Sequence, residues 1–380
     1  MNNDSHDPFG AAHPPTGSFA PVQVGNHRLE GMATDLFVQV PTTLIEPTRT
    51  VIAAEGVGVV YTVPSQSRPR RSVVARAAVH QTRQVCPDAA ILVDAGLYSG
   101  KSRKPASTPP SQDWVTVQRS AGLEWALTDS GYLAAGDTAG LRRTLKAASA
   151  FGTKVIAALP IANKWLSHDA DVLREAIDKF GIPVALMVED TYDPFDRPHV
   201  VAGLVNVLSA RTPVLLLRSD TAGLGALAYG AAGAALGSSS VYRHIFPAMN
   251  GGRNPSVSFV LPELLAYASM GVFERHFIKD EMHAAWRCDC THCGGRDLTW
   301  LRTAADPEAA ALSHSVAAVA MLGRGLTDAI AHHTGPQAWT AMCTAAQLHN
   351  IEIEKLTDGK WSRKHALDAW VQITPEPVPA

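Results

Sequence analysis

Short apolar runs rich in β-branched residues alternate with helical patterns along most of the chain. This order predicts an α/β protein in which crossover helices join parallel strands. Nearly every run ends in polar residues, and eight runs are candidate strands: 35–40, 57–63, 89–96, 123–130, 153–160, 182–190, 212–220 and 230–239. Clear helical patterns lie between the later runs, at 169–181 and 197–210. Eight such units favour a (β/α)8 barrel of the TIM type over an open sheet.

An open, doubly wound sheet is the alternative architecture. It would be supported by a glycine-rich loop that binds a dinucleotide between a strand and a helix. The glycine-rich segment 223–230 lies instead inside a helical pattern, where small residues favour close helix packing. The pattern therefore favours the (β/α)8 barrel.

The pattern changes to helices near residue 260. Apolar residues recur at helical spacing in 261–271, 307–323 and 337–356. These patterns predict a C-terminal helical subdomain at 281–372, packed on a barrel at 26–280. The polar, Gly- and Pro-rich residues 1–25 are expected to form a flexible leader.

Composition limits the classes of protein that remain. The chain has 380 residues, of which 46% are hydrophobic and 18% charged, and a net charge of −2. This charge gives no global attraction to nucleic acid, so any basic surface must be local. No uninterrupted apolar run approaches the ~20 residues that span a bilayer, and the N-terminus lacks the features of a signal peptide. With only five cysteines, we expect a cytoplasmic protein with reduced thiols and no membrane partner.

Carboxylates follow the apolar residues of four candidate strands. They are Asp94 in LVDAG, Asp129 in LTDS, Glu189 and Asp190 in MVED, and Asp220 in LRSD. Singly, each is more typical of a helix N-cap or a turn. In a barrel, however, the carboxyl ends of the strands converge on the active site. Several carboxylates there can act as acid, base and nucleophile, as glycosyl transfer requires.

Three of the five cysteines form a compact group, Cys288-x-Cys290-x-x-Cys293. Zinc is commonly held by four thiolate or imidazole ligands, so the group needs a fourth. His314 lies in a helical pattern twenty-one residues after Cys293, and His292 is the local alternative within the loop. A closed Cys3His set is typical of a structural zinc ion. We expect Zn²⁺ there to fix the appendage to the barrel.

These segments resemble the tRNA-guanine transglycosylase family, whose barrel carries a zinc-binding subdomain. The motif RCDCTHC followed by LSHS is similar to its zinc segment, although the family spacing is a few residues longer. ILVDAGLYSG resembles a family segment whose Asp works in acid–base chemistry and substrate recognition, which implies that role for Asp94. WVTVQRSAGLEWALTDSGY resembles a segment that ends in a base-binding Asp, here Asp129. The similarity covers about residues 85–320.

Family members exchange guanine in nucleic acid for a 7-deazaguanine through a covalent bond between an Asp and the sugar C1′. The resemblance therefore implies this chemistry, with zinc as a structural cofactor. This sequence departs from the family pattern in two places that bear on the chemistry. VEDTYDPF stands where the family has a Gly-rich, Glu-ending segment, and the eighth-strand region AAGAALGSSSVYRH has no carboxylate where the family has its nucleophile. Asp220 and Asp190 remain as candidate nucleophiles, with a slight preference for Asp220.

Basic and polar segments offer places for substrate binding. The segment 237–244 contains Arg243 and His244, which with nearby Arg253 are candidates for binding phosphate. The loop 65–76 is basic and is either a backbone-binding loop or a solvated one. The basic segment 101–107 follows Asp94 directly, which places positive charge at the barrel mouth. Glu189 is a further candidate for substrate binding, together with Asp129.

Three functional hypotheses follow. The first is a base-exchange transferase, for which divergence from the tRNA pattern and the lack of an evident additional RNA-binding domain favour DNA over tRNA. The second is a non-catalytic nucleic-acid-binding subunit that has lost the nucleophile. The third is a lyase or aldolase, but no Lys at a strand end supports it. Either a homodimer or a heteromeric modification complex is compatible with the sequence.

Overall fold

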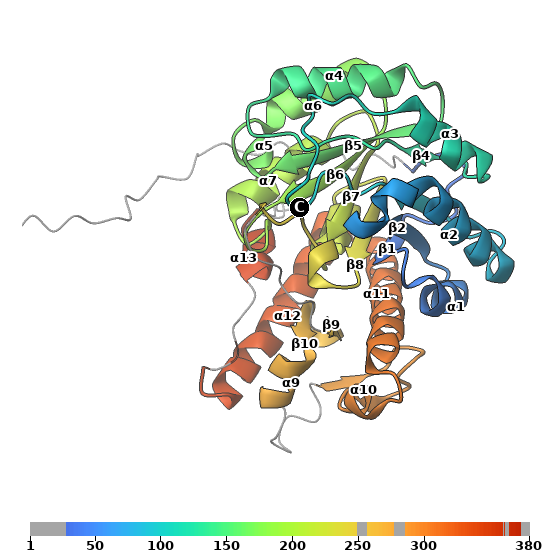
Figure 1. Ribbon diagram of the computed structural model, residues 1–380. Helices are drawn as coiled ribbons and strands as arrows, with labels where there is room; N and C mark the ends of the chain where they lie inside the picture. The colour runs from blue at the N-terminus through green and yellow to red at the C-terminus, as the bar shows by residue number, and fades with distance from the viewer. Residues whose placement is uncertain (1–27, 249–256, 277–285, 360, 362–364, 374–380) are drawn as a thin grey trace, which may run out of the picture.

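The computed structural model describes residues 28–248, 257–276, 286–359, 361 and 365–373 (Figure 1). The expected leader, Arg253 and the expected boundary near residue 280 lie outside these residues. Large buried apolar side chains run continuously from the strands into the C-terminal helices.

Eight parallel strands form the central sheet, one from each of the eight expected runs. They are β1 (Leu36–Pro41), β2 (Gly58–Thr62), β3 (Ile91–Asp94), β4 (Ala126–Leu127), β5 (Val155–Ala162), β6 (Val184–Glu189), β7 (Val214–Ser219) and β8 (Gly233–Gly237). Their order is β3-β2-β1-β8-β7-β6-β5-β4, so the first and last strands pair, as in a barrel. The prediction of a (β/α)8 barrel is confirmed.

The barrel is nearly closed, because β3 and β4 share no hydrogen-bonded ladder. Gln118, which is fully buried on helix α3 (Gln112–Ser120), covers the unpaired edge of β4 instead. Its side-chain nitrogen donates to the Leu127 carbonyl at 2.8 Å, and its side-chain oxygen accepts from the Leu127 amide at 3.0 Å. Beyond the strands, Pro105 and Tyr132 form a parallel bridge. The gap is therefore sealed by a side chain and by the loops.

Helices cover the outside of the barrel between successive strands (Figure 1). Besides α3 they are α1 (Ile45–Glu55), α2 (Arg71–Val85), α4 (Thr138–Ser149), α5 (Lys164–Ser167), α6 (Ala170–Phe180), α7 (Pro198–Leu208) and α8 (Ala222–Ala228). A Cβ atom at Gly225 of α8 would lie 2.6 Å from Nε1 of Trp339. Gly225 thus allows the close helix packing that was expected for this segment.

The C-terminal part begins with a hairpin and continues with helices. Its elements are β9 (Ser258–Leu261), β10 (Ala266–Ser269), α9 (Met270–His276), β11 (Arg287–Cys288), β12 (Arg296–Asp297), α10 (Trp300–Thr303), α11 (Pro307–Ile330), α12 (Gly335–Leu356) and α13 (His365–Ile373). In Figure 1, α11 and α12 lie below the barrel strands, and α13 lies beside α7.

The prediction of a helix over 261–271 is wrong. The segment reverses direction within a short 3-10 turn, Pro262–Leu264, so that β9 and β10 pair antiparallel. Leu265 completes the turn with a φ of 45°, in the left-handed region that ends a right-handed helix. The apolar spacing that indicated a helix reflects burial of both strands of the hairpin.

Helix α11 is long and apolar enough to cross a membrane by length and composition alone. Its most apolar window is 56% buried inside the protein, and the helix packs on α1, β9 and α12. A core helix of this length passes the same test, so the finding is weak evidence for a membrane span.

Candidate active site and metal centre

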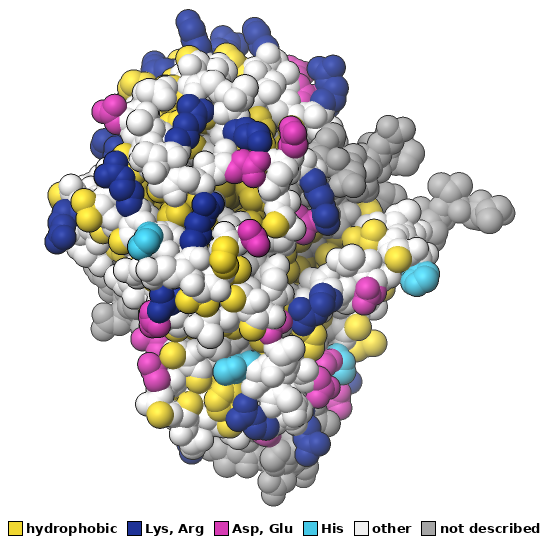
Figure 2. Space-filling view, turned by 90° about the vertical axis from the view of Figure 1, so that its right-hand side faces the viewer, with side chains coloured by type: hydrophobic (Ala, Val, Ile, Leu, Met, Phe, Trp, Pro, Cys, Tyr) yellow, Lys and Arg dark blue, Asp and Glu magenta, His cyan; other side chains and the backbone are white. Residues whose placement is uncertain are grey.

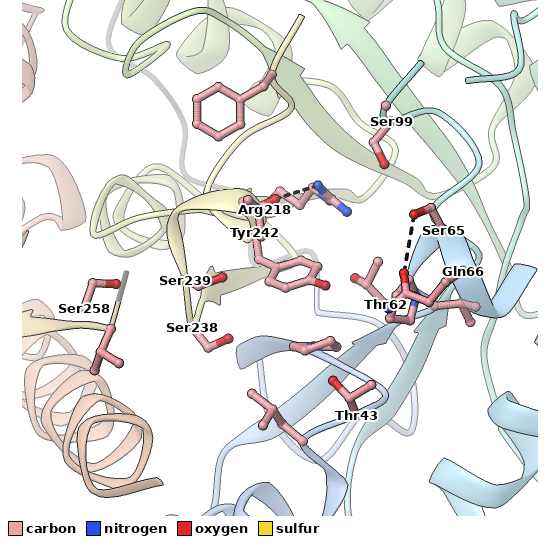
Figure 3. Close-up of a pocket in the computed structure, with 18 of the residues that line it drawn as sticks. Thr43, Thr62, Ser65, Gln66, Ser99, Arg218, Ser238, Ser239, Tyr242 and Ser258 are labelled. Atoms are coloured by element: carbon pink, nitrogen blue, oxygen red, sulfur yellow. Dashed lines mark hydrogen bonds between the residues drawn. The ribbon is translucent and has the colours of Figure 1, made fainter. Parts of the chain in front are cut away.

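A cavity of about 1150 Å³ opens at the carboxyl-terminal ends of β1, β2, β7 and β8 (Figure 3). This is the end of the barrel where TIM-type enzymes bind their substrates. Its wall is rich in hydroxyl groups, which include those of Thr62, Ser65, Ser99, Ser238, Ser239 and Tyr242. The charged side chains in its described wall are Lys101, Arg218 and Glu308. Such a lining suits a polar ligand that carries negative charge.

Asp94 lies directly behind the cavity wall, and 1% of its surface is exposed. Its Oδ2 atom accepts hydrogen bonds from Tyr98 at 2.6 Å, from Thr62 at 3.1 Å and from Gln39 at 3.4 Å. Its Oδ1 atom accepts from the Gly96 amide at 2.8 Å. Burial raises the pKa of Tyr98 well above its usual value, so the phenol keeps its proton and can donate the hydrogen bond to Asp94. A carboxylate held in this way has fixed acceptor positions.

Arg218 in β7 joins this network, and the sequence analysis did not identify it. Its Nε atom lies 3.9 Å from Oδ2 of Asp94, and its Nη1 atom donates to the Val241 carbonyl at 2.9 Å. The guanidinium lies over the rings of Tyr98 and Tyr242, at 5.0 and 5.3 Å from their centres. A charged residue inside an otherwise apolar run, LLLRSD, was the signal available in the sequence.

Asp129 and Glu189 are each bound by one cation, from the start of helix α2 and from the loop after β3 respectively. Asp129 pairs with Arg71 at 2.9 Å and accepts from the Ser111 amide at 2.7 Å. Glu189 accepts hydrogen bonds from Arg103 and from the Tyr132 hydroxyl. Neither carboxylate lies in the described wall of the large cavity.

The two candidate nucleophiles also lie outside that wall. Asp190 accepts hydrogen bonds from Asn163 and Arg197. Asp220 accepts from the Ala222 amide at 2.9 Å and lies beside Asp193, in a small cavity of about 60 Å³. Burial and the neighbouring Asp220 carboxylate raise the pKa of Asp193 well above its usual value.

Arg243 and His244 are packed inward and do not line the large cavity. Arg243 lies over the ring of Tyr267, 3.7 Å from its centre, and donates to the Ser258 hydroxyl. His244 stacks at a tilt on Phe246, with 4.0 Å between ring centres. Burial lowers the pKa of His244 to about 4, so its ring is neutral at pH 7. Ser238, Ser239 and Tyr242 of segment 237–244 supply hydroxyl groups to the cavity wall instead.

The basic side chains of segments 65–76 and 101–107 make different contacts. In 65–76, Arg68 donates to the carbonyls of Gly96 and Ser99, so this cation fixes the loop that follows β3. In 101–107, Lys101 is exposed and lines the cavity, whereas Lys104 is exposed outside the wall. Figure 2 shows Lys and Arg side chains spread over the barrel half of one face, with acidic groups between them. On this face, therefore, the positive charges are interspersed with negative ones and form no separate basic patch.

Cys288, Cys290, Cys293 and His314 converge as the sequence predicts. All four are buried, and one ligand atom from each lies within 4.8 Å of the other three. Tetrahedral zinc bound to thiolates requires sulfur atoms about 3.8 Å apart, so the group fits a metal ion of this kind. Hydrogen bonds from Cys288 and Cys293 lower the pKa of Cys290, which favours the thiolate that binds metal. His292 does not belong to the group.

Backbone geometry and neighbouring groups orient these ligands. Gly294 and Gly295 have φ values of 59° and 81°, which lets the loop fold back so that their amides donate to the carbonyls of Cys290 and Cys288. His314 places its Nδ1 atom 3.1 Å from Sγ of Cys293, while its Nε2 atom lies 2.8 Å from the Val260 carbonyl. That second contact fixes the ring so that Nδ1 faces the thiolates. All five cysteines of the chain are free thiols.

Comparison with known proteins finds only distant structural similarity. No protein-family model and no curated protein matches the sequence. The chain is similar in structure to a thiamine phosphate pyrophosphorylase from Pyrococcus furiosus, with 14% identity, a TM-score of 0.34, and coverage of 55% of this chain and 87% of that one. It is also similar to a 3-hexulose-6-phosphate synthase from Salmonella typhimurium, with 14% identity, a TM-score of 0.34, and coverage of 54% and 89%. At these scores the similarities say nothing about activity.

Proposed function

We propose that this protein is a base-exchange transglycosylase that replaces guanine in nucleic acid with a 7-deazaguanine, with DNA favoured over tRNA. The observation that carries the proposal is the cavity at the barrel mouth, with Asp94 held behind its wall. Ligand pockets commonly measure about 300–1,000 Å³, so a cavity of about 1150 Å³ has room for an extruded nucleotide and its flanking groups. The Cys3His group supports the same family.

The exchange needs a carboxylate on each side of the nucleoside. The bond between C1′ and the base nitrogen breaks, and its electron pair leaves with guanine, which takes up a proton. A carboxylate oxygen forms an ester with C1′. The incoming base then attacks C1′, loses a proton and releases the carboxylate. Asp94 is placed to accept hydrogen bonds from the guanine edge if Thr62, which lines the cavity, exchanges its bond to Asp94 for one to the ligand.

Three carboxylates are candidates for the nucleophile. Asp220 and Asp190 are candidates from the resemblance, but both are engaged by protein groups. Glu308 in the first turn of α11 is the carboxylate that the described cavity wall contains, and the sequence analysis did not consider it. We therefore include Glu308 as a third candidate.

The proposed metal is Zn²⁺ in a structural role. Four protein ligands complete a tetrahedral site, so a zinc ion there has no open position for substrate. The ion would hold α11 and the Cys loop together. The cluster is linked to the barrel through Glu55 of α1, which accepts hydrogen bonds from Thr291 and Arg324.

A second candidate function is a nucleic-acid-binding subunit without catalysis. It is favoured by the observation that all five strand-end carboxylates lie outside the described cavity wall. Such a subunit would use the same cavity to hold a nucleotide for a catalytic partner.

One assay separates the two functions. The zinc-loaded protein is incubated with radiolabelled guanine or a labelled 7-deazaguanine and with duplex DNA or tRNA. The proposal expects incorporation into nucleic acid, with more into DNA than into tRNA. No incorporation by a folded protein that still binds these nucleic acids would refute base exchange and support the binding subunit. If incorporation occurs, Asp220→Asn, Asp190→Asn and Glu308→Gln are compared, and loss of the covalent adduct in denaturing gels identifies the nucleophile.

A further inference from the structure

Arg218 has a backbone conformation that arginine rarely adopts. Its φ is 51°, in the left-handed region where a side chain crowds the backbone. The pairing of β7 with β8 shifts register between Leu216 and Ser219, and such bulges redirect side chains. Gln39 holds the conformation, because its Oε1 atom accepts the Arg218 amide hydrogen at 2.7 Å. Strain of this kind is concentrated at functional sites.

The guanidinium of Arg218 is fixed but retains donors that the protein does not use. The side chain is 4% exposed and lies in the cavity wall. Its Nε atom has no hydrogen-bond partner among the described residues. In Figure 3 its terminal nitrogens point toward the side where Ser65 and Ser99 lie. Because the guanidinium lies in the cavity wall, its terminal N–H groups can donate to acceptor atoms of a ligand.

The charge around Arg218 favours an anion. Lys101 and Arg218 are positive in the described cavity wall, and Glu308 is the negative residue there. Behind the wall, Arg68 adds a third cation, close to Asp94 and Arg218. The two carboxylates, Asp94 beside Arg218 and Glu308 in the wall, therefore balance only part of this positive charge. A planar guanidinium with free N–H donors matches the oxygens of a phosphate group.

We propose that Arg218 binds a phosphate group of the ligand, with Lys101 and the Ser99 hydroxyl beside it. The cavity would then bind a phosphorylated nucleoside in preference to a nucleoside or a free base. The kind of nucleoside rests on the proposed function, whereas the preference for phosphate rests on the surroundings of Arg218. A phosphodiester of nucleic acid and the phosphate of a free nucleotide share this chemistry.

The test measures binding to the zinc-loaded full chain by calorimetry. The probes are guanosine, guanosine monophosphate, inorganic phosphate and a short single-stranded oligodeoxynucleotide without terminal phosphates. We expect the monophosphate to bind on the order of tenfold more tightly than guanosine, with inorganic phosphate as a competitor. Arg218→Lys and Lys101→Gln should reduce that preference. Lys104→Gln, in the same loop but outside the wall, is the matched control and should keep it.

The outcomes separate cleanly. Arg218→Lys keeps a cation beside Asp94, and Lys101 is exposed, so both variants are expected to fold, which circular dichroism checks. Equal affinity for guanosine and its monophosphate, or a preference unchanged in both variants, would overturn the inference. Tighter binding of the oligonucleotide supports a phosphodiester ligand, and binding of the mononucleotide alone supports a free nucleotide. Phosphate preference without base incorporation refutes only the proposed function, and incorporation without phosphate preference refutes only this inference.

Discussion

The Nε2 atom of His314 lies 2.8 Å from the carbonyl oxygen of Val260, so helix α11 and strand β9 meet at the Cys3His cluster. The same two elements form part of the cavity wall, to which β9 contributes Ser258 and α11 contributes Glu308 and Leu312. Leu312 is two residues from His314. An ion bound by the cluster would therefore fix one side of the cavity as well as the C-terminal fold.

This relationship predicts different effects for two histidines of the cluster region. His314→Ala should abolish metal binding, lower the melting temperature and weaken nucleotide binding, because α11 and the Cys loop lose their shared ligand set. His292→Ala is the matched control and should retain the metal. Metal content by plasma emission spectrometry and thermal melts check both. A His314→Ala protein that still holds one zinc ion per chain would show that the assigned fourth ligand is incorrect.

Asp94→Asn tests the centre of the polar network. The substitution keeps the shape of the side chain but leaves the buried guanidinium of Arg218 without its counter-charge. We expect a loss of about 3 kcal/mol in the free energy of unfolding, as for other broken buried pairs. Base exchange should fall to background. Asp171→Asn, at an exposed pair with Arg174, should change stability by less than about 1 kcal/mol. Full exchange activity in Asp94→Asn would exclude a role for this carboxylate in the reaction.

Gln118 tests how the barrel is sealed between β3 and β4. Gln118→Ala leaves the buried amide and carbonyl of Leu127 without their side-chain partners. Unpaired buried groups of this kind cost about 1–3 kcal/mol each, so we expect a marked loss of stability in urea unfolding. Gln112→Ala, at the exposed start of the same helix, is the control. If the two variants unfold alike, Gln118 does not seal the gap.

Most of the barrel could be predicted because its signal is local. Each strand is a short apolar run whose own residues are buried, and all eight runs contain a strand. The exception lies at 261–271, where apolar spacing alone did not distinguish a helix from two buried strands. The Cys3His group was also predictable, since three ligands lie within six residues and the fourth lies in a recognisable helix.

The candidate site was less predictable because its contacts are long-range. The sequence identified Asp94 and Glu189 at strand ends, but not that Arg103 would bind Glu189 from 86 positions away. It also gave no indication that Gln39 would fix the backbone of Arg218 across 179 positions. Such partners depend on how the strands are arranged around the barrel. A charge within an apolar run, as at Arg218, is the local feature of the sequence that indicates such a site residue.

The final prediction concerns pH and His244. Burial lowers the pKa of His244 to about 4, whereas a histidine in an unfolded chain titrates near 6.5. Between these values the unfolded chain takes up a proton that the folded protein does not, so stability falls as the pH drops from 7 toward 4. We expect the wild type to lose about 1–2 kcal/mol more than His244→Gln between pH 7 and pH 5 in urea unfolding. The raised pKa of Asp193 acts in the opposite direction, but it is present in both proteins and cancels in their difference. His80→Gln, at an exposed position, should behave like the wild type. Parallel pH profiles for the wild type and His244→Gln would mean that His244 is protonated in the folded protein as readily as in the unfolded chain.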